Sequence, residues 1–435
     1  MKNYKLSDET KTLPWGLVLH RVVATTTFTL ACGLTVNAGD VGGWIEKESN
    51  LSGNAWVSDN AMVYDNAKVS GSAKVFGNAL VSGYAKVFGN AKISGDALVR
   101  GYVSVSDNAQ VYGNALVSDN AQVYGNARIY DNAQVSGDAQ VSGDAWIYDN
   151  AQASSNAWIH DNAQASSNAK VSDNARVSGN ALVSGDAKVS GDARVSGHAR
   201  VFGHARVYDN AQVFGNAKVS GNAQVYGNTW VSSNAQVYGN AQVFGSAKAT
   251  CNAHVFGNSK VSDDAWVSSN AMVFGNAKVS GYAQAYGDAQ VFGNAQVSEF
   301  ARVYGNAQIY GDAQVYGDAY VYDNAKASCN AQVYGDAQVS GDAWVTDNAK
   351  VFGDAWVSGD AQVKNTNDYL VFKNNWSSCR YFTWTKSNDM WLVGCFYGTG
   401  DELIKKAYAD SEDSGKHYGA CVKSVETLKA MEQEK

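Results

Sequence analysis

Apolar residues recur at every sixth position along most of this chain, and polar residues fill the positions between them. From Ile45 to Val363, 53 steps of six residues mark 54 positions, and every one of them holds Val, Ile, Leu or Ala. In nearly every repeat, an Ala stands two residues before that position. Because side chains alternate across a strand, the Ala and the second apolar residue would face inward together, and the residue between them would face outward.

Most hexads end in Gly-Asn, Asp-Asn or Gly-Asp. These residue types tolerate the backbone conformations that a sharp corner needs. A short strand and a corner every six residues predict a three-sided coil with 18 residues per turn, in which each strand lies parallel to the strand one turn earlier. The hexads therefore predict an all-β solenoid of about 18 turns, roughly 85 Å long at a strand spacing of ~4.8 Å.

The unit Ala-x-Val-[Ser/Tyr/Phe]-[Gly/Asp/Ser]-[Asn/Asp] resembles the hexapeptide signature of single-stranded left-handed parallel β-helices, and the handedness is implied by that resemblance alone. The flanking sequences abandon the frame, and we expect them to cover the two open sheet edges. Three parts are predicted: an N-terminal capping segment over residues 1–44, the hexapeptide-repeat β-helix over 45–363, and a small α+β capping domain over 364–435.

The C-terminal part has its own pattern. Aromatic runs predict strands over 369–373, 381–386 and 390–397. A helix is predicted to begin near Asp401, after Gly398-Thr399-Gly400, and apolar residues at helical spacing continue over 418–431. This tail resembles the C-terminal tails of prophage-type proteins.

The N-terminal flank carries a more specific resemblance. The segments Tyr4-Lys5-Leu6-Ser7, Leu19-His20-Arg21-Val22-Val23-Ala24 and Ala38-Gly39-Asp40-Val41-Gly42-Gly43-Trp44-Ile45 resemble the opening of bacterial YdcK-type hexapeptide-repeat proteins. Members of that family are commonly labelled acetyltransferases. The resemblance therefore implies transfer of an acyl group to a hydroxyl or an amine, with acetyl-CoA as the donor.

The residues themselves favour catalysis poorly. Acyltransferases with this fold resemble one another in a loop inserted in a turn, or a C-terminal helix, that walls off a cleft between subunits, where a histidine acts as general base. Here no insertion interrupts the hexads. His198 and His204 occupy successive corners, roughly 15 Å apart along the chain, so they cannot share a substrate atom. His160 and His254 occupy outward slots. We therefore predict no catalytic residue.

Residues 18 apart in the chain are neighbours on one face, and two such columns are candidate interaction surfaces. The apolar column comprises Trp44, Met62, Leu80, Leu98 and Leu116. Either residues 1–43 fold back over it, or it forms a seam between copies of the chain. The aromatic column comprises Tyr238, Phe256, Phe274, Phe292 and Tyr310. Its rings either stabilise the repeat by cross-strand stacking or bind glycans or a protein partner.

Charge and composition argue against several classes of protein. The net charge is −7 without a basic block, which argues against a nucleic-acid partner, and the Lys/Arg cluster over 170–218 is interpreted as solvated surface. No run approaches the ~20 apolar residues of a membrane span. The N-terminus lacks a secretory leader, so a cytoplasmic location is expected, with virion or cell-surface association as the alternative. The six cysteines form no Cys-x-x-Cys pair, so neither a metal site nor a disulfide framework is expected.

These patterns together predict a non-enzymatic spacer, scaffold or adhesion shaft, with a phage or prophage connection as one setting. It would use no cofactor and would contact a protein partner or another copy of itself. Acetyl-CoA enters only under the acyltransferase alternative, and a glycan partner only under the binding interpretation of the aromatic column.

Overall fold

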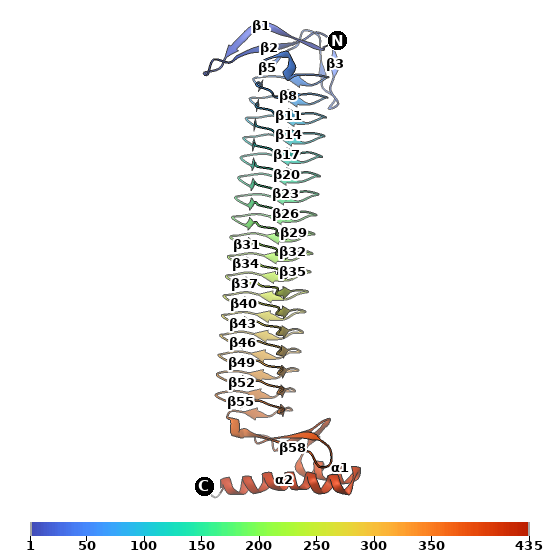
Figure 1. Cartoon of the computed structure of the whole chain (residues 1–435), viewed down its shortest axis with the longest axis vertical. Helices are drawn as coiled ribbons and strands as arrows, with labels where there is room; N and C mark the ends of the chain where they lie inside the picture. Colours follow the sequence, from blue (N-terminus) through green and yellow to red (C-terminus); the bar gives the residue numbers. More distant parts are fainter. Residues whose placement is uncertain (1, 434–435) are drawn as a thin grey trace. The chain divides into compact units, whose positions relative to one another are not determined.

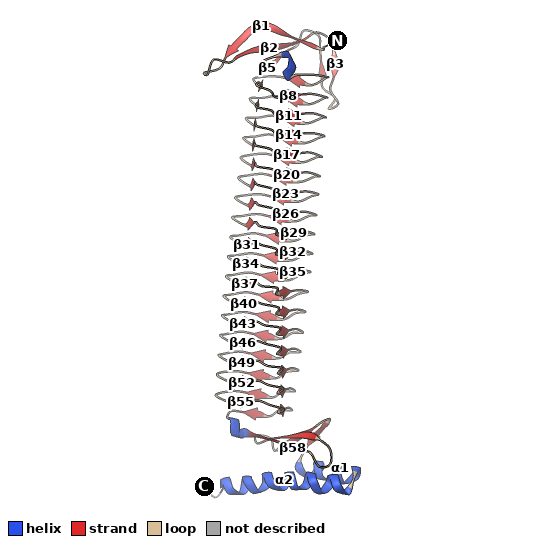
Figure 2. Cartoon of the chain, viewed as in Figure 1, coloured by secondary structure: helices blue, strands red, loops and turns tan. Residues whose placement is uncertain are grey.

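The computed structural model describes residues 2–433. The chain divides into two compact units, Met1–Asn228 and Thr229–Lys435. In both units, each hexad contributes one two-residue strand (Figures 1 and 2). One strand begins every six residues, from β6 (Trp56–Val57) to β34 (Gln224–Val225) in the first unit and from β35 (Trp230–Val231) to β57 (Gln362–Val363) in the second.

Within each unit, a hexad strand pairs in parallel with the strand that begins 18 residues later, wherever the unit contains that later strand. In the first unit, for example, Lys92 lies opposite Gln110, and Gln110 lies opposite Arg128. In the second unit, Gln290 lies opposite Gln308 in the same manner. The register does not slip, so the predicted parallel β-solenoid with three faces is confirmed.

The interior is built from the two apolar positions of each hexad. Ala109 and Val111 are fully buried, as are their equivalents in the other turns. Ser259 occupies an Ala slot, and its hydroxyl donates to the carbonyl oxygen of Val273 at 3.1 Å, which satisfies a buried polar group. Each buried Val contributes about 1.5 kcal/mol or more, so stability accumulates turn by turn.

The corners carry side-chain ladders as well as turns. The first corner residue adopts a left-handed backbone, as Asp107 does at φ 58°. The Asp107 carboxylate accepts from the backbone N–H of Gly125 at 3.0 Å. At the second corner position, the Asn108 amide donates to Asn126 at 3.1 Å, and Asn126 donates to Asp144 at 2.9 Å. The corner residues therefore hold successive turns together, in addition to allowing the chain to bend.

The N-terminal segment forms an antiparallel sheet that continues into the first turn. β2 pairs antiparallel with both β1 and β5, and β5 pairs in parallel with β7. The elements are β1 (Tyr4–Thr12), β2 (Val18–Ala24), β3 (Phe28–Thr29), β4 (Thr35–Val36), β5 (Val41–Ile45), the 3₁₀ turn η1 (Glu48–Asn50) and β7 (Met62–Val63).

This segment supplies hydrogen-bond donors to the first turn. Backbone N–H groups of each turn donate to carbonyl groups of the following turn, as Trp56 N–H does to Ala73, so the first turn is left with carbonyl oxygens that need donors. The Tyr4 hydroxyl donates to the carbonyl oxygens of Glu48, at 2.7 Å, and Leu51. Arg21 Nη1 donates to the carbonyl oxygen of Asp59 at 3.0 Å.

The C-terminal domain is a four-stranded antiparallel sheet with two helices. Phe382 and Trp391 of the sheet pack with Leu403 and Val422 of the helices in one core. Neither helix is long and apolar enough to span a bilayer. The elements are the 3₁₀ turn η2 (Thr366–Asp368), β58 (Tyr369–Asn374), β59 (Arg380–Thr385), β60 (Met390–Val393), β61 (Phe396–Gly398), α1 (Gly400–Asp410) and α2 (Glu412–Gln433).

One detail of the predicted tail is wrong. Residues 390–397 are two strands, β60 and β61, because Gly394 adopts φ 56° and reverses the chain between them. Val393 consequently pairs with Phe396 across a tight turn. A glycine is suited to this position because an L side chain is strained at positive φ.

The C-terminal domain supplies hydrogen-bond acceptors to the last turns of the solenoid. The Thr383 hydroxyl accepts from the backbone N–H of Trp356 at 2.9 Å, and the Ser387 hydroxyl accepts from that of Gln362 at 2.7 Å. The last turn has no following carbonyl groups to accept its N–H groups. The domain therefore covers this sheet edge with groups of the matching polarity.

Candidate functional site

The apolar column is covered only at its start. Trp44 lies opposite Met62, and the register continues through Leu80, Leu98 and Leu116. Leu13 and Leu19 of the N-terminal segment bury Trp44, with Met62 partly buried at the edge of the cluster. The last three leucines are half-buried and carry no such cover. The N-terminal segment therefore folds back over Trp44 and Met62 only. That Leu80, Leu98 and Leu116 form a seam between copies of the chain stays a prediction.

The aromatic column is a continuous stack within the second unit. Neighbouring rings from Tyr238 to Tyr310 lie 4.8–5.1 Å apart at their centroids, with interplanar angles of 2–6°. The inner rings are therefore covered on both faces by other rings, and the stack turns its edges to solvent. Sugar rings bind to aromatic faces, so this geometry favours cross-strand stabilisation over glycan binding.

Indole groups on the strand faces are also tied into the solenoid. Trp266 Nε1 donates to the Thr250 hydroxyl at 2.9 Å, and Trp344 Nε1 donates to the Ser328 hydroxyl at 2.8 Å. In both pairs the acceptor lies 16 residues earlier in the chain. Trp56 sits in an outward slot but is buried, because Phe28 of the N-terminal segment packs edge-on against it at 5.9 Å.

The histidines are not brought together. His204 Nδ1 lies 3.2 Å from a carboxylate oxygen of Asp186, and His160 Nδ1 lies 3.1 Å from one of Asp161. His417 in α2 lies 3.4 Å from Asp413, one helical turn away. Each histidine of these pairs thus has its own corner or helix carboxylate as a local partner. Across residues 2–433, no group of three His, Cys, Asp or Glu side chains has a geometry that could hold a metal ion.

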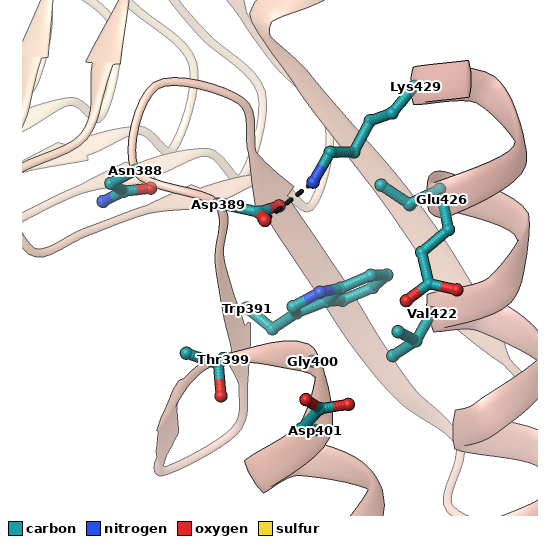
Figure 3. A pocket seen from close by; sticks show the side chains of 10 residues that line it. Asn388, Asp389, Trp391, Thr399, Gly400, Asp401, Val422, Glu426 and Lys429 are labelled. Atoms are coloured by element: carbon teal, nitrogen blue, oxygen red, sulfur yellow. Dashed lines mark hydrogen bonds and ion pairs between the residues drawn. The ribbon is translucent and has the colours of Figure 1, made fainter. Parts of the chain in front are cut away.

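The C-terminal domain contains a pocket of about 330 Å³ that the sequence did not predict (Figure 3). It lies where β60, the first turn of α1 and the face of α2 meet. Its lining comprises Asn388, Asp389, Trp391, Thr399, Gly400, Asp401, Val422, Val425, Glu426 and Lys429. Gly400 allows α1 to approach α2, since a Cβ there would lie 2.8 Å from Val422 Cγ1.

The polar groups of this pocket are largely engaged in holding the domain together. The Asp389 carboxylate pairs with Lys429 Nζ at 2.7 Å and accepts from Trp384 Nε1 at 2.8 Å. Thr399 caps α1, and its hydroxyl donates to Glu402 Oε2 at 3.0 Å. Thr399 carries the one side-chain hydroxyl of the lining, and this cap engages it. The backbone N–H of Thr399 also lowers the pKa of the Glu402 carboxyl group.

Asp401 and Glu426 are the remaining carboxylates of the pocket (Figure 3). With them the pocket could hold a small cationic group, but its lining contains no cysteine, serine or histidine that could act as nucleophile or base. The only sequence signal near it was the helix start after Gly398-Thr399-Gly400. The pairing of Asp389 with Lys429 joins residues 40 apart in the chain and has no local signature.

Comparison with known families agrees with the repeat. The family model described as YdcK beta solenoid repeat matches six stretches of the solenoid, at residues 109–122, 121–137, 169–185, 175–191, 211–227 and 331–347. No curated protein sequence matches the chain at a significant level.

Proposed function

We propose that this YdcK-type β-solenoid repeat protein is a non-catalytic spacer or scaffold that presents its strand faces and its terminal caps to partners. The observation that carries the proposal is the unbroken hexad frame from Ile45 to Val363. An acyltransferase of this architecture would need an inserted loop or a C-terminal helix to wall off a cleft. No loop interrupts the hexads, and helices α1 and α2 pack on the sheet of their own domain.

The geometry of the side chains supports the same role. The aromatic column, the indole hydrogen bonds and the corner ladders all join one turn to the next, so they contribute to the stability of the coil. The lining of the pocket in the C-terminal domain contains no cysteine, serine or histidine, and its Asp389–Lys429 pair attaches α2 to the sheet. An adhesion shaft or a phage-associated spacer would use such a coil in the same way.

Acetyl-CoA binding separates this proposal from the acyltransferase alternative. We expect isothermal titration of the full-length protein with acetyl-CoA to give no saturable heat, with free CoA as the matched control for its nucleotide portion. Saturable binding of acetyl-CoA would contradict the proposal and would favour an acyl-transfer site, also when free CoA, the product of the transfer, binds as well.

A further inference from the structure

Acidic and basic side chains are separated on the surface of the solenoid. The outward strand slots from Trp56 to Gln362 number 52, and none of them holds Asp or Glu. Every acidic residue of these hexads stands at one of the two corner positions. All basic residues of the same hexads except Arg100 stand in the outward strand slots. The net charge of −7 therefore averages over anionic corners and cationic faces.

The cationic faces are concentrated in one stretch of the first unit, which we call the basic belt (residues 169–219, turns that include β26, β29 and β31 in Figure 1). Seven of its nine outward slots hold Lys or Arg, against four aspartates in the same residues. All seven cations are exposed. They are Lys170, Arg176, Lys188, Arg194, Arg200, Arg206 and Lys218.

The four aspartates of the belt have structural partners at the corners. Asp173 and Asp209 accept from the backbone N–H groups one turn later, at 3.1 and 3.2 Å. Asp192 accepts from the Asn174 amide at 3.0 Å. Asp186 accepts from the Asn168 amide at 2.9 Å and also contacts His204. Hydrogen bonds to the turns thus account for all four carboxylates.

The cations of the belt have no carboxylate partner, although Arg176 Cζ lies 5.4 Å from the centroid of the Trp158 ring. None of the seven lies within 4.0 Å of a carboxylate anywhere in residues 2–433. Instead they are stacked on one another: Lys170 lies opposite Lys188, and Lys188 lies opposite Arg206. Arg176 and Arg194 are opposed in the same way on a second face.

Like charges directly opposite each other on adjacent strands destabilise a sheet. Neutral residues are compatible with these slots, since Gln134 and Gln152 fill earlier positions of the column that holds Lys170. A local arrangement that costs stability without an internal compensation is expected where a surface serves a partner. The partner of this surface must carry negative charge.

The residues beside the cations indicate which polyanion fits. Half-exposed serines stand two residues after five of the seven cations, at Ser172, Ser178, Ser190, Ser196 and Ser220. Hydroxyl groups next to ammonium and guanidinium groups suit a ligand that carries both charge and hydroxyls. Proteins that bind single-stranded nucleic acids add a row of aromatic rings on which successive bases stack. The aromatic residues of the belt, Phe202, Tyr208 and Phe214, stand in successive hexads and therefore on three different faces, so they form no such row within the belt.

We propose that the basic belt is a docking surface for an anionic polysaccharide, carboxylated or sulfated, that lies along a column of stacked cations. This goes beyond the role of spacer because it assigns a chemical class of partner to a defined surface. It does not depend on the outcome of the acetyl-CoA titration.

The test measures binding of the full-length protein to heparin, which is sulfated, and to alginate, which is carboxylated, with neutral dextran and poly(dT) as comparisons. We expect at least one of the two anionic polysaccharides to bind more tightly than poly(dT), dextran not to bind, and the affinity to fall steeply with salt. Lys170→Gln/Lys188→Gln/Arg206→Gln should weaken binding about tenfold or more and flatten the salt dependence. Glutamine already occupies this column, so the variant should fold.

The matched control is Arg302→Gln/Lys326→Gln/Lys350→Gln, which removes the same charge from outward slots of the second unit whose paired residues on adjacent strands are uncharged. We expect it to bind as the unmodified protein does. Three results would overturn the proposal. The first is that neither heparin nor alginate binds, and the second is that both triple variants lose affinity equally. The third is that poly(dT) binds more tightly than both polysaccharides. The last result would identify a nucleic-acid surface instead.

Discussion

The hydroxyl oxygen of Thr383 accepts a hydrogen bond from the backbone N–H of Trp356 at 2.9 Å. The donor belongs to the last turns of the solenoid, and the acceptor belongs to the sheet of the C-terminal domain. At the start of the solenoid the roles are reversed, since the Tyr4 hydroxyl donates to the carbonyl oxygen of Glu48. Each cap therefore offers the hydrogen-bonding group that its own sheet edge lacks.

Replacing Thr383 by valine tests how much this hydrogen bond contributes to stability. Thr383 is almost fully buried, so Thr383→Val keeps the volume and leaves the Trp356 N–H without an acceptor. We expect the free energy of unfolding to fall by about 1–2 kcal/mol, measured by urea denaturation. Thr383→Ser retains the hydroxyl and serves as the control. A loss in Thr383→Ser without a loss in Thr383→Val would show that the methyl contacts, and not the hydrogen bond, are responsible.

Ile129→Ala should destabilise the solenoid through its packing. Ile129 is fully buried between Val111 and Ile147 of the adjacent turns, and the truncation would leave a cavity. We expect a loss of about 2–4 kcal/mol in denaturant unfolding. Arg128→Gln, at the neighbouring exposed slot, should change stability by less than about 0.5 kcal/mol. Comparable effects of the two substitutions would contradict the assigned inward and outward positions.

Removal of one complete turn should be tolerated. Deletion of residues 133–150 joins Asn132 to Ala151 and keeps the hexad frame, and Asn132 can then reach Asn168 as it now reaches Asn150. Because each turn contacts only its neighbours, we expect a folded protein with the same circular dichroism per residue. Deletion of nine residues breaks the three-sided register and should prevent folding. If the deletion of a full turn folded but abolished a measured function, the spacer role would be contradicted.

Tyr286, Tyr304 and Tyr322 form a second stack of rings in the second unit, and this stack predicts a loss of stability at high pH. Burial and the neighbouring Tyr322 and Tyr286 raise the pKa of Tyr304 to about 12. In the unfolded chain the group titrates near ~10, so between these values the unfolded state loses its proton while the folded state keeps it. The stabilisation is complete below pH ~10 and is lost as pH rises towards 12.

Tyr304→Phe tests this dependence because it keeps the ring and removes the titrating hydroxyl. We expect the variant to lose less stability than the unmodified protein between pH 9 and pH 11, about the range in which unfolded tyrosine titrates. Thermal unfolding across that range is the measurement, and absorbance of tyrosinate reports the titration itself. Parallel pH profiles for the two proteins would rule out a contribution from Tyr304.

The candidate surfaces could be predicted in part. The columns of residues 18 apart follow from the period alone, so the stacking of Phe256 on Phe274 was foreseeable. That their faces cover each other required ring orientations, which the sequence does not contain. The cover over Trp44 and Met62 comes from Leu13 and Leu19 of the N-terminal segment, a contact that the six-residue period does not contain.

What the sequence determined by itself was the coil: which side chains face inward, where the corners lie and which residues are neighbours after one turn. These properties repeat every six residues and depend only on strand alternation and corner geometry, which are local. The tertiary structure alone decided how the edges are satisfied and how the C-terminal domain is held together. Those features join residues such as Tyr4 and Glu48, or Asp389 and Lys429, whose meeting depends on the path of the whole intervening chain.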